Sequence, residues 1–247
     1  FISKFSSDLT TLSASTFIGT SGTEEVRALV LDSSNALYVG IYQSSGSGLE
    51  TTASVLQTAS GAGYIAKLSS NLQTLNIGTY FGGTGTGTEI LRLVLDSSNI
   101  VYVAGIAGSV FTTTSGAYDT SFNGGTYDGF VSKITANLQT LSESTYIGGS
   151  ADDFVHALGL SADQDNVYIG GYTEDSTTDY PTTVGAYDTT HNGGEDGFIT
   201  ILGAIAGGGG QDGGGGAPVP EFSTFMYIAT LLWCGYFMFK KFNSQTV

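Results

Sequence analysis

The sequence contains one cysteine, three prolines and two histidines among 247 residues. Because Cys234 is alone, no intrachain disulfide can form, and packing and strand hydrogen bonds must hold the fold. Two histidines, His156 and His191, are too few for a histidine-rich metal site. No Ser/His/Asp order, Cys/His nucleophile pair or zinc-ligand spacing is present, so we expect a protein that is not an enzyme.

Positive charge is also scarce: 7 Lys and Arg residues stand against 22 Asp and Glu, a formal net charge of −15. Lys240 and Lys241 are two of those seven, so the part before Phe222 has a net charge of −17. Such a field repels nucleic-acid phosphates, and we expect no nucleic-acid partner. It can keep an extracellular domain soluble or attract cations.

One short strand-like motif recurs along the chain and defines a repeat. Phe130-Val131-Ser132-Lys133-Ile134 matches segments that begin at Phe1, Tyr64 and Phe198, so the starts are spaced by 63, 66 and 68 residues. The 37 glycines and the many β-branched and aromatic residues favour short strands separated by turns.

Each repeat contains four runs typical of antiparallel strands. The predicted strands are 12–18, 25–31, 37–42 and 64–68, then 75–81, 90–95, 101–106 and 130–134, then 141–147, 154–160, 167–172 and 198–202. We therefore divide the chain into a last strand of a preceding unit (1–5) and three units, 6–68, 69–134 and 135–205.

The turn between the second and third strands of each unit also recurs. It reads Asp32-Ser33-Ser34-Asn35, Asp96-Ser97-Ser98-Asn99 and Asp163-Gln164-Asp165-Asn166. Aspartate can accept a hydrogen bond from the backbone two residues on, and asparagine tolerates the left-handed conformation that such a turn needs. We interpret these acids as turn formers.

Three acidic clusters could supply oxygen ligands to calcium, which takes six to eight of them. They are Asp152 with Asp153; Asp119 with Asn123 and Asp128; and Asp188 with Asn192, Glu195 and Asp196. None has EF-hand spacing, and turn capping explains the same residues equally well. Calcium is the one cofactor that the sequence suggests. His156 aligns with Arg27 on a second strand and is interpreted as an ordinary variable position.

The segments 145–153, 166–172 and 185–198 together resemble the SBBP-type β-propeller repeat of secreted and surface bacterial and archaeal proteins. The resemblance covers about residues 1–205. It implies an all-β fold in which each four-stranded unit is one blade, with three blades present. Because propellers usually have about four to eight blades, we expect the three blades to form a partial propeller and this chain to be a fragment of a larger one.

The C-terminal part differs in composition. A Gly-rich linker occupies 206–218, and 222–239 is an uncharged run long enough to cross a membrane as a helix. Lys240 and Lys241 follow this run, which begins at Phe222 and ends at Phe239, so we expect a cytoplasmic C-terminus and extracytoplasmic repeats. Any signal peptide would lie upstream of Phe1.

The tail 219–247 resembles the PEP-CTERM and PEF-CTERM sorting signals, with Pro220, Glu221 and Phe222 as the short motif. The resemblance implies an exosortase-like or archaeosortase-like processing enzyme as a partner, and release or envelope attachment after cleavage. Phe222 departs from the PEP form, which has proline there.

These observations predict a surface-anchored β-propeller for binding or adhesion, with a polysaccharide or a surface protein as ligand. One alternative is an extracellular polysaccharide hydrolase or lyase whose catalytic residues lie mostly outside this chain. Another is a structural component of a biofilm or surface layer.

Overall fold

The computed structural model describes residues 1–44, 48–84, 87–174 and 179–203. The chain divides into two units, 1–211 and 212–247, and every described residue belongs to the first. In these ranges the protein has thirteen strands and no helix, and every strand pairing is antiparallel. The predicted all-β class is confirmed for the described part of the chain.

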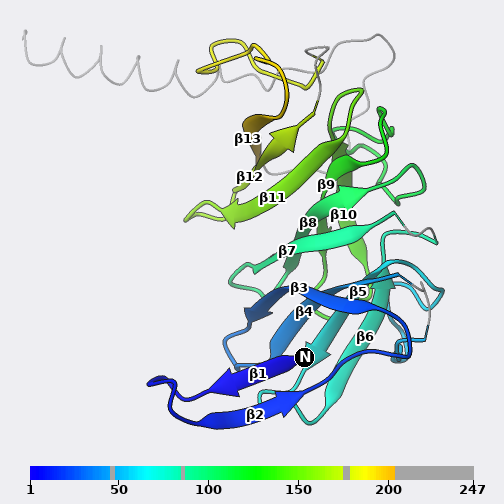
Figure 1. The fold of residues 1–247 in the computed structure, drawn as a ribbon, viewed down its shortest axis with the longest axis vertical. Coiled ribbons are helices and arrows are strands. Elements are labelled where there is room, and N and C mark those ends of the chain that lie inside the picture. Colours follow the sequence, from blue (N-terminus) through cyan, green and yellow to red (C-terminus); the bar gives the residue numbers. More distant parts are fainter. Residues whose placement is uncertain (45–47, 85–86, 175–178, 204–247) are drawn as a thin grey trace, which may run out of the picture. The chain divides into compact units, whose positions relative to one another are not determined.

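The strands lie at the predicted places, with small shifts at their ends (Figure 1). Their bounds are β1 Ile2–Phe5, β2 Leu12–Thr16, β3 Glu24–Leu31, β4 Leu37–Gln43, β5 Gly63–Leu68, β6 Leu75–Phe81, β7 Glu89–Leu95, β8 Val101–Ala107, β9 Asp128–Ile134, β10 Leu141–Ile147, β11 Asp153–Leu160, β12 Asn166–Thr173 and β13 Asp196–Gly203.

The strands form four sheets in the orders β1-β2, β3-β4-β5-β6, β7-β8-β9-β10 and β11-β12-β13. The predicted units 6–68, 69–134 and 135–205 therefore begin one strand earlier than the sheets do. The turn 69–74 joins β5 to β6 directly: the Ser69 N–H donates to the Thr74 carbonyl, and the Thr74 N–H donates to the Ser69 hydroxyl. A periodic sequence determines the length of the unit but not where the unit starts, because a four-strand cycle can be cut at any turn.

Successive sheets lie face to face, and their first strands are neighbours. Strand β3 contacts β7, and β7 contacts β11 (Figure 1). Side chains alternate between the two faces of each sheet. In β4, for example, Tyr38 joins the cluster shared with the β7–β10 sheet, and Val39 joins a cluster on the opposite face.

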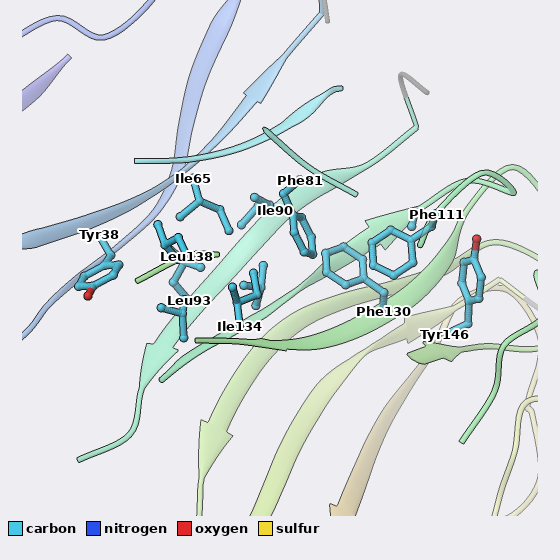
Figure 2. Close-up of a cluster of buried hydrophobic side chains, with 13 residues drawn as sticks. Tyr38, Ile65, Phe81, Ile90, Leu93, Phe111, Phe130, Ile134, Leu138 and Tyr146 are labelled. Atoms are coloured by element: carbon cyan, nitrogen blue, oxygen red, sulfur yellow. The ribbon is translucent and has the colours of Figure 1, made fainter. Parts of the chain in front are cut away.

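The largest buried cluster lies between the β3–β6 and β7–β10 sheets (Figure 2). Its centre is aromatic: the Phe111 ring lies 4.5 Å from the Phe130 ring and 5.5 Å from the Tyr146 ring, and Phe130 lies 5.7 Å from Phe81. Such pairs contribute beyond the area they bury. The recurrent aromatic at the start of β9 is therefore an inter-sheet contact.

Two of the three predicted turns adopt the expected conformation. Asn35 and Asn99 both have a φ of 62°, and the preceding aspartates accept hydrogen bonds from the backbone. The third turn is different, because Gln164 (φ 64°), not Asn166, has the positive φ. There the Ser161 N–H donates to the Asn166 carbonyl, which makes a turn one residue longer than that of Asp32 and Ala36. The prediction for Asn166 was wrong.

No helix in the described residues is long and apolar enough to cross a membrane. The predicted linker 206–218, the segment 222–239 and the tail 219–247 lie outside the described residues. The same is true of the individual residues predicted there, namely Pro220, Glu221, Phe222, Phe239, Lys240 and Lys241.

Candidate functional site

Asp128 begins strand β9 and is fully buried. Its Oδ2 accepts a hydrogen bond from the Asn123 N–H at 2.7 Å, whereas Oδ1 is buried without a hydrogen-bond donor. Burial, and then the negative charges of Asp153 and Asp119, raise the Asp128 pKa to about 7. A carboxylate in this position needs a proton or a cation to offset its charge.

Asp153 begins strand β11 of the neighbouring sheet and is also fully buried. Its Oδ2 accepts the Gly149 N–H at 2.7 Å. The two carboxyl groups face each other at Gly148: a Cβ on this glycine would lie 2.5 Å from Asp153 Oδ2 and 3.3 Å from Asp128 Cγ. A side chain at residue 148 would therefore fill the space between the two acids.

Asp119 and Asn123 complete this group, which we call the sheet-junction acids (Asp119, Asn123, Asp128 and Asp153). The Asn123 Nδ2 donates to Asp119 Oδ2 at 2.6 Å and to the Gly148 carbonyl at 3.4 Å. The structure thus brings one predicted cluster together with Asp153, a member of another.

Asp152 does not share the environment of Asp153. Its Oδ1 accepts the backbone N–H groups of Thr126 and Tyr127, the latter at 3.1 Å. It therefore ties the loop before β9 to the loop before β11. Asp152 thus accepts hydrogen bonds from the backbone of a loop, which agrees with the alternative interpretation of this cluster as turn-capping residues.

The third predicted cluster repeats one hydrogen bond of the second but is open to solvent. The Asn192 N–H donates to Asp196 Oδ2, as Asn123 does to Asp128. Asp188 accepts the Thr190 N–H at 2.9 Å, and both Asp188 and Asn192 are exposed. In the part of the chain that the structure describes, no group of three or more His, Cys, Asp and Glu side chains has an arrangement suited to a metal. Any cation here would need amide, carbonyl or water oxygens besides the two buried acids.

A second feature is a set of three nearly parallel rings, which we call the aromatic platform (Phe154, His156 and Tyr172). The Phe154 and Tyr172 rings lie 4.7 Å apart, and His156 lies 5.6 Å from Tyr172 and 6.2 Å from Phe154. All three ring planes are within 16° of parallel. His156 is exposed, and the other two rings are partly exposed.

A β-bulge explains why His156 reaches this surface. The pairing of β11 with β12 shifts between Val155 and Ala157, which leaves His156 as the extra residue. Bulges redirect side chains and are frequent next to functional sites. Burial and the nearby Arg92 charge lower the His156 pKa, so the ring is neutral at pH 7.

The sequence prediction missed the platform. Phe154 and Tyr172 are 18 positions apart in the printed chain and become neighbours only through the β11–β12 register. Only the alignment of Phe154 opposite Tyr172 on paired strands could have indicated the platform, and the sequence alone does not give the β11–β12 register that sets this alignment. In the β3–β6 sheet the equivalent bulged residue is Arg27, which pairs with Glu25 at 2.9 Å.

A scan against models of known protein families found no match, and a search of curated proteins found no relative.

Proposed function

We propose that this chain is a non-enzymatic β-propeller protein of the cell surface that binds polysaccharide through the aromatic platform. The propeller is supported by two successive four-stranded sheets with the same strand order, by their face-to-face packing with a third sheet, and by first strands that are mutual neighbours. The SBBP-type resemblance of residues 1–205 supports the same architecture.

The observation that carries the binding proposal is the platform formed by Phe154, His156 and Tyr172. The stacked rings are partly exposed, and they offer apolar surface against which the C–H face of a sugar ring can pack. Because His156 is neutral at pH 7, the platform itself has no charge. The net charge of −17 before Phe222 disfavours polyanions, and the preferred ligand is therefore a neutral polysaccharide.

Surface display is proposed from the tail. The uncharged run 222–239 followed by Lys240 and Lys241 supports a membrane anchor with the repeats outside the cytoplasm. The likeness of Pro220-Glu221-Phe222 to a PEP-CTERM or PEF-CTERM motif supports processing by an exosortase-like or archaeosortase-like enzyme.

The test is a glycan array with the full chain in detergent, followed by a reducing-end assay on every polysaccharide that binds. We expect binding of neutral polysaccharides and no release of reducing ends. Steady release of reducing ends would replace the binding proposal with a hydrolase, and release of unsaturated products would replace it with a lyase. Binding to no glycan would contradict the proposal.

A further inference from the structure

The loop before strand β13 contains an Asn-Gly pair that directly follows a histidine. The sequence has two Asn-Gly pairs, Asn123-Gly124 and Asn192-Gly193, at equivalent places of the repeat. In such a pair the glycine nitrogen can attack the side-chain carbonyl of the asparagine, because glycine has no Cβ to obstruct the close approach of its backbone. The structure gives the two pairs different surroundings.

At the second pair, the nitrogen that would attack is hydrogen-bonded to a base. The Gly193 N–H donates to His191 Nδ1 at 3.1 Å, so this ring nitrogen carries no proton and can accept the one that Gly193 must lose. The ring is held in this place, since the His191 side chain is only 7% exposed. Asp196 Oδ2 lies 4.0 Å from Nδ1, and its negative charge favours an imidazole that has gained a proton.

The second pair also has room to react. Asn192 is exposed, and its Nδ2 donates to the Thr190 carbonyl at 3.1 Å. A Cβ placed on Gly193 would have no neighbour within 4 Å among the described residues. The backbone at Gly193 can therefore close onto the Asn192 side chain without a clash.

The first pair provides an internal comparison, because its surroundings hinder the same step. Phe122 stands in place of the histidine, so the residue before this asparagine cannot accept a proton. The Asn123 Nδ2 donates to Asp119 Oδ2 at 2.6 Å, which holds the side-chain amide. A Cβ on Gly124 would lie 2.2 Å from the Ser150 carbonyl oxygen, so this part of the backbone is tightly packed.

We propose that Asn192 is a site of self-modification, in which His191 acts as the base that converts Asn192-Gly193 to a succinimide. The Gly193 nitrogen gives its proton to His191 Nδ1 and forms a bond to Asn192 Cγ. The Cγ–Nδ2 bond then breaks, and Nδ2 takes the proton back from the imidazolium and leaves as ammonia. Water opens the succinimide at either carbonyl, which gives aspartate or isoaspartate and adds one negative charge beside Asp196. This inference is independent of the proposed polysaccharide binding.

The first experiment incubates the folded full chain in detergent near neutral pH and follows both Asn-Gly pairs by peptide mass spectrometry. Conversion of the amide to an acid changes the peptide mass, and chromatography separates isoaspartate from aspartate. We expect Asn192 to convert about one-hundredfold faster than Asn123, the lower end of the range for a positioned general base. In the urea-unfolded chain the two rates should become similar, because the surroundings of both pairs are lost.

His191→Phe introduces the residue of the first pair and should slow conversion of Asn192 about one-hundredfold. His191→Gln is the matched control for a purely structural role. Its side-chain oxygen can accept the Gly193 N–H but cannot take the proton, so this variant should be as slow as His191→Phe. Melting temperatures of both variants show whether they are folded.

Three results would overturn the proposal. One is an equal rate at Asn192 and Asn123 in the folded, unmodified chain. Another is a rate difference that persists in urea, since the neighbouring sequence and not the folded loop would then set it. The third is normal conversion of Asn192 in a folded His191→Gln variant, since the histidine would then only orient the backbone.

Discussion

The Lys67 ammonium lies 3.1 Å from the Asp32 carboxylate and connects strand β5 to the turn between β3 and β4. The same ammonium donates to the Tyr38 hydroxyl at 2.8 Å. Burial opposes ionisation of Asp32, but hydrogen bonds from Ser34, Lys67 and backbone N–H groups outweigh it and lower the Asp32 pKa to about 2. The recurring lysine of the strand motif therefore has a defined partner in this sheet.

Lys67→Met should lower the free energy of unfolding by about 1.5–3 kcal/mol, the range for a hydrogen bond to a charged group. Urea denaturation monitored by tyrosine fluorescence measures this change. Lys4→Met is the matched control, because the exposed Lys4 at the equivalent position makes one bond, to the Ser70 carbonyl at 3.3 Å. It should change stability by no more than about 0.5 kcal/mol. Equal losses for both variants would contradict the role given to Asp32.

Stability should fall as the pH rises from about 4 to about 7. Asp128 has a pKa of about 7 in the folded chain and an ordinary value near 3.9 when unfolded, so only the folded state keeps the proton in this window. Melting temperatures at several pH values measure the effect. Asp128→Asn should make the melting temperature nearly independent of pH in this window. It should not change the loss of stability between about pH 4 and pH 2, which comes from protonation of Asp32.

Phe130→Ala should destabilise the protein by about 3–5 kcal/mol, since it removes a fully buried ring that contacts Phe81 and Phe111. Phe130→Leu keeps most of the volume and should cost less. Guanidinium denaturation measures both. Tyr187→Ala, at a fully exposed aromatic, should be neutral to within about 0.5 kcal/mol. A loss for Phe130→Ala as small as that for Tyr187→Ala would contradict the inter-sheet role.

Tyr172→Ala should weaken polysaccharide binding at least tenfold, about 1.4 kcal/mol, because it removes the ring that contacts both other members of the platform. Isothermal titration with the best glycan from the array measures the change. Tyr187→Ala again provides the control and should bind normally. Unchanged affinity of a folded Tyr172→Ala variant would exclude the platform as the binding surface.

The strand prediction succeeded because strand and turn signals are local. Short β-branched and aromatic runs bounded by Gly, Asp and Asn give the same result in every copy. The prediction for the turn at Gln164 failed for a local reason as well: this turn has one residue more than the other two, and a different position takes the positive φ. The acidic clusters named from the sequence were a broad set, and the packing of two sheets brings Asp119, Asn123 and Asp128 together with Asp153.

The sequence by itself determined the repeat, its four-strand content and the strand positions, because these follow from composition and periodicity along the chain. Only the tertiary structure decided where each sheet begins, that Asp153 but not Asp152 faces Asp128, and that Phe154, His156 and Tyr172 share one surface. The physical reason is that these relations depend on cross-strand register and on the packing of one sheet against the next, which bring together residues that are distant in the chain.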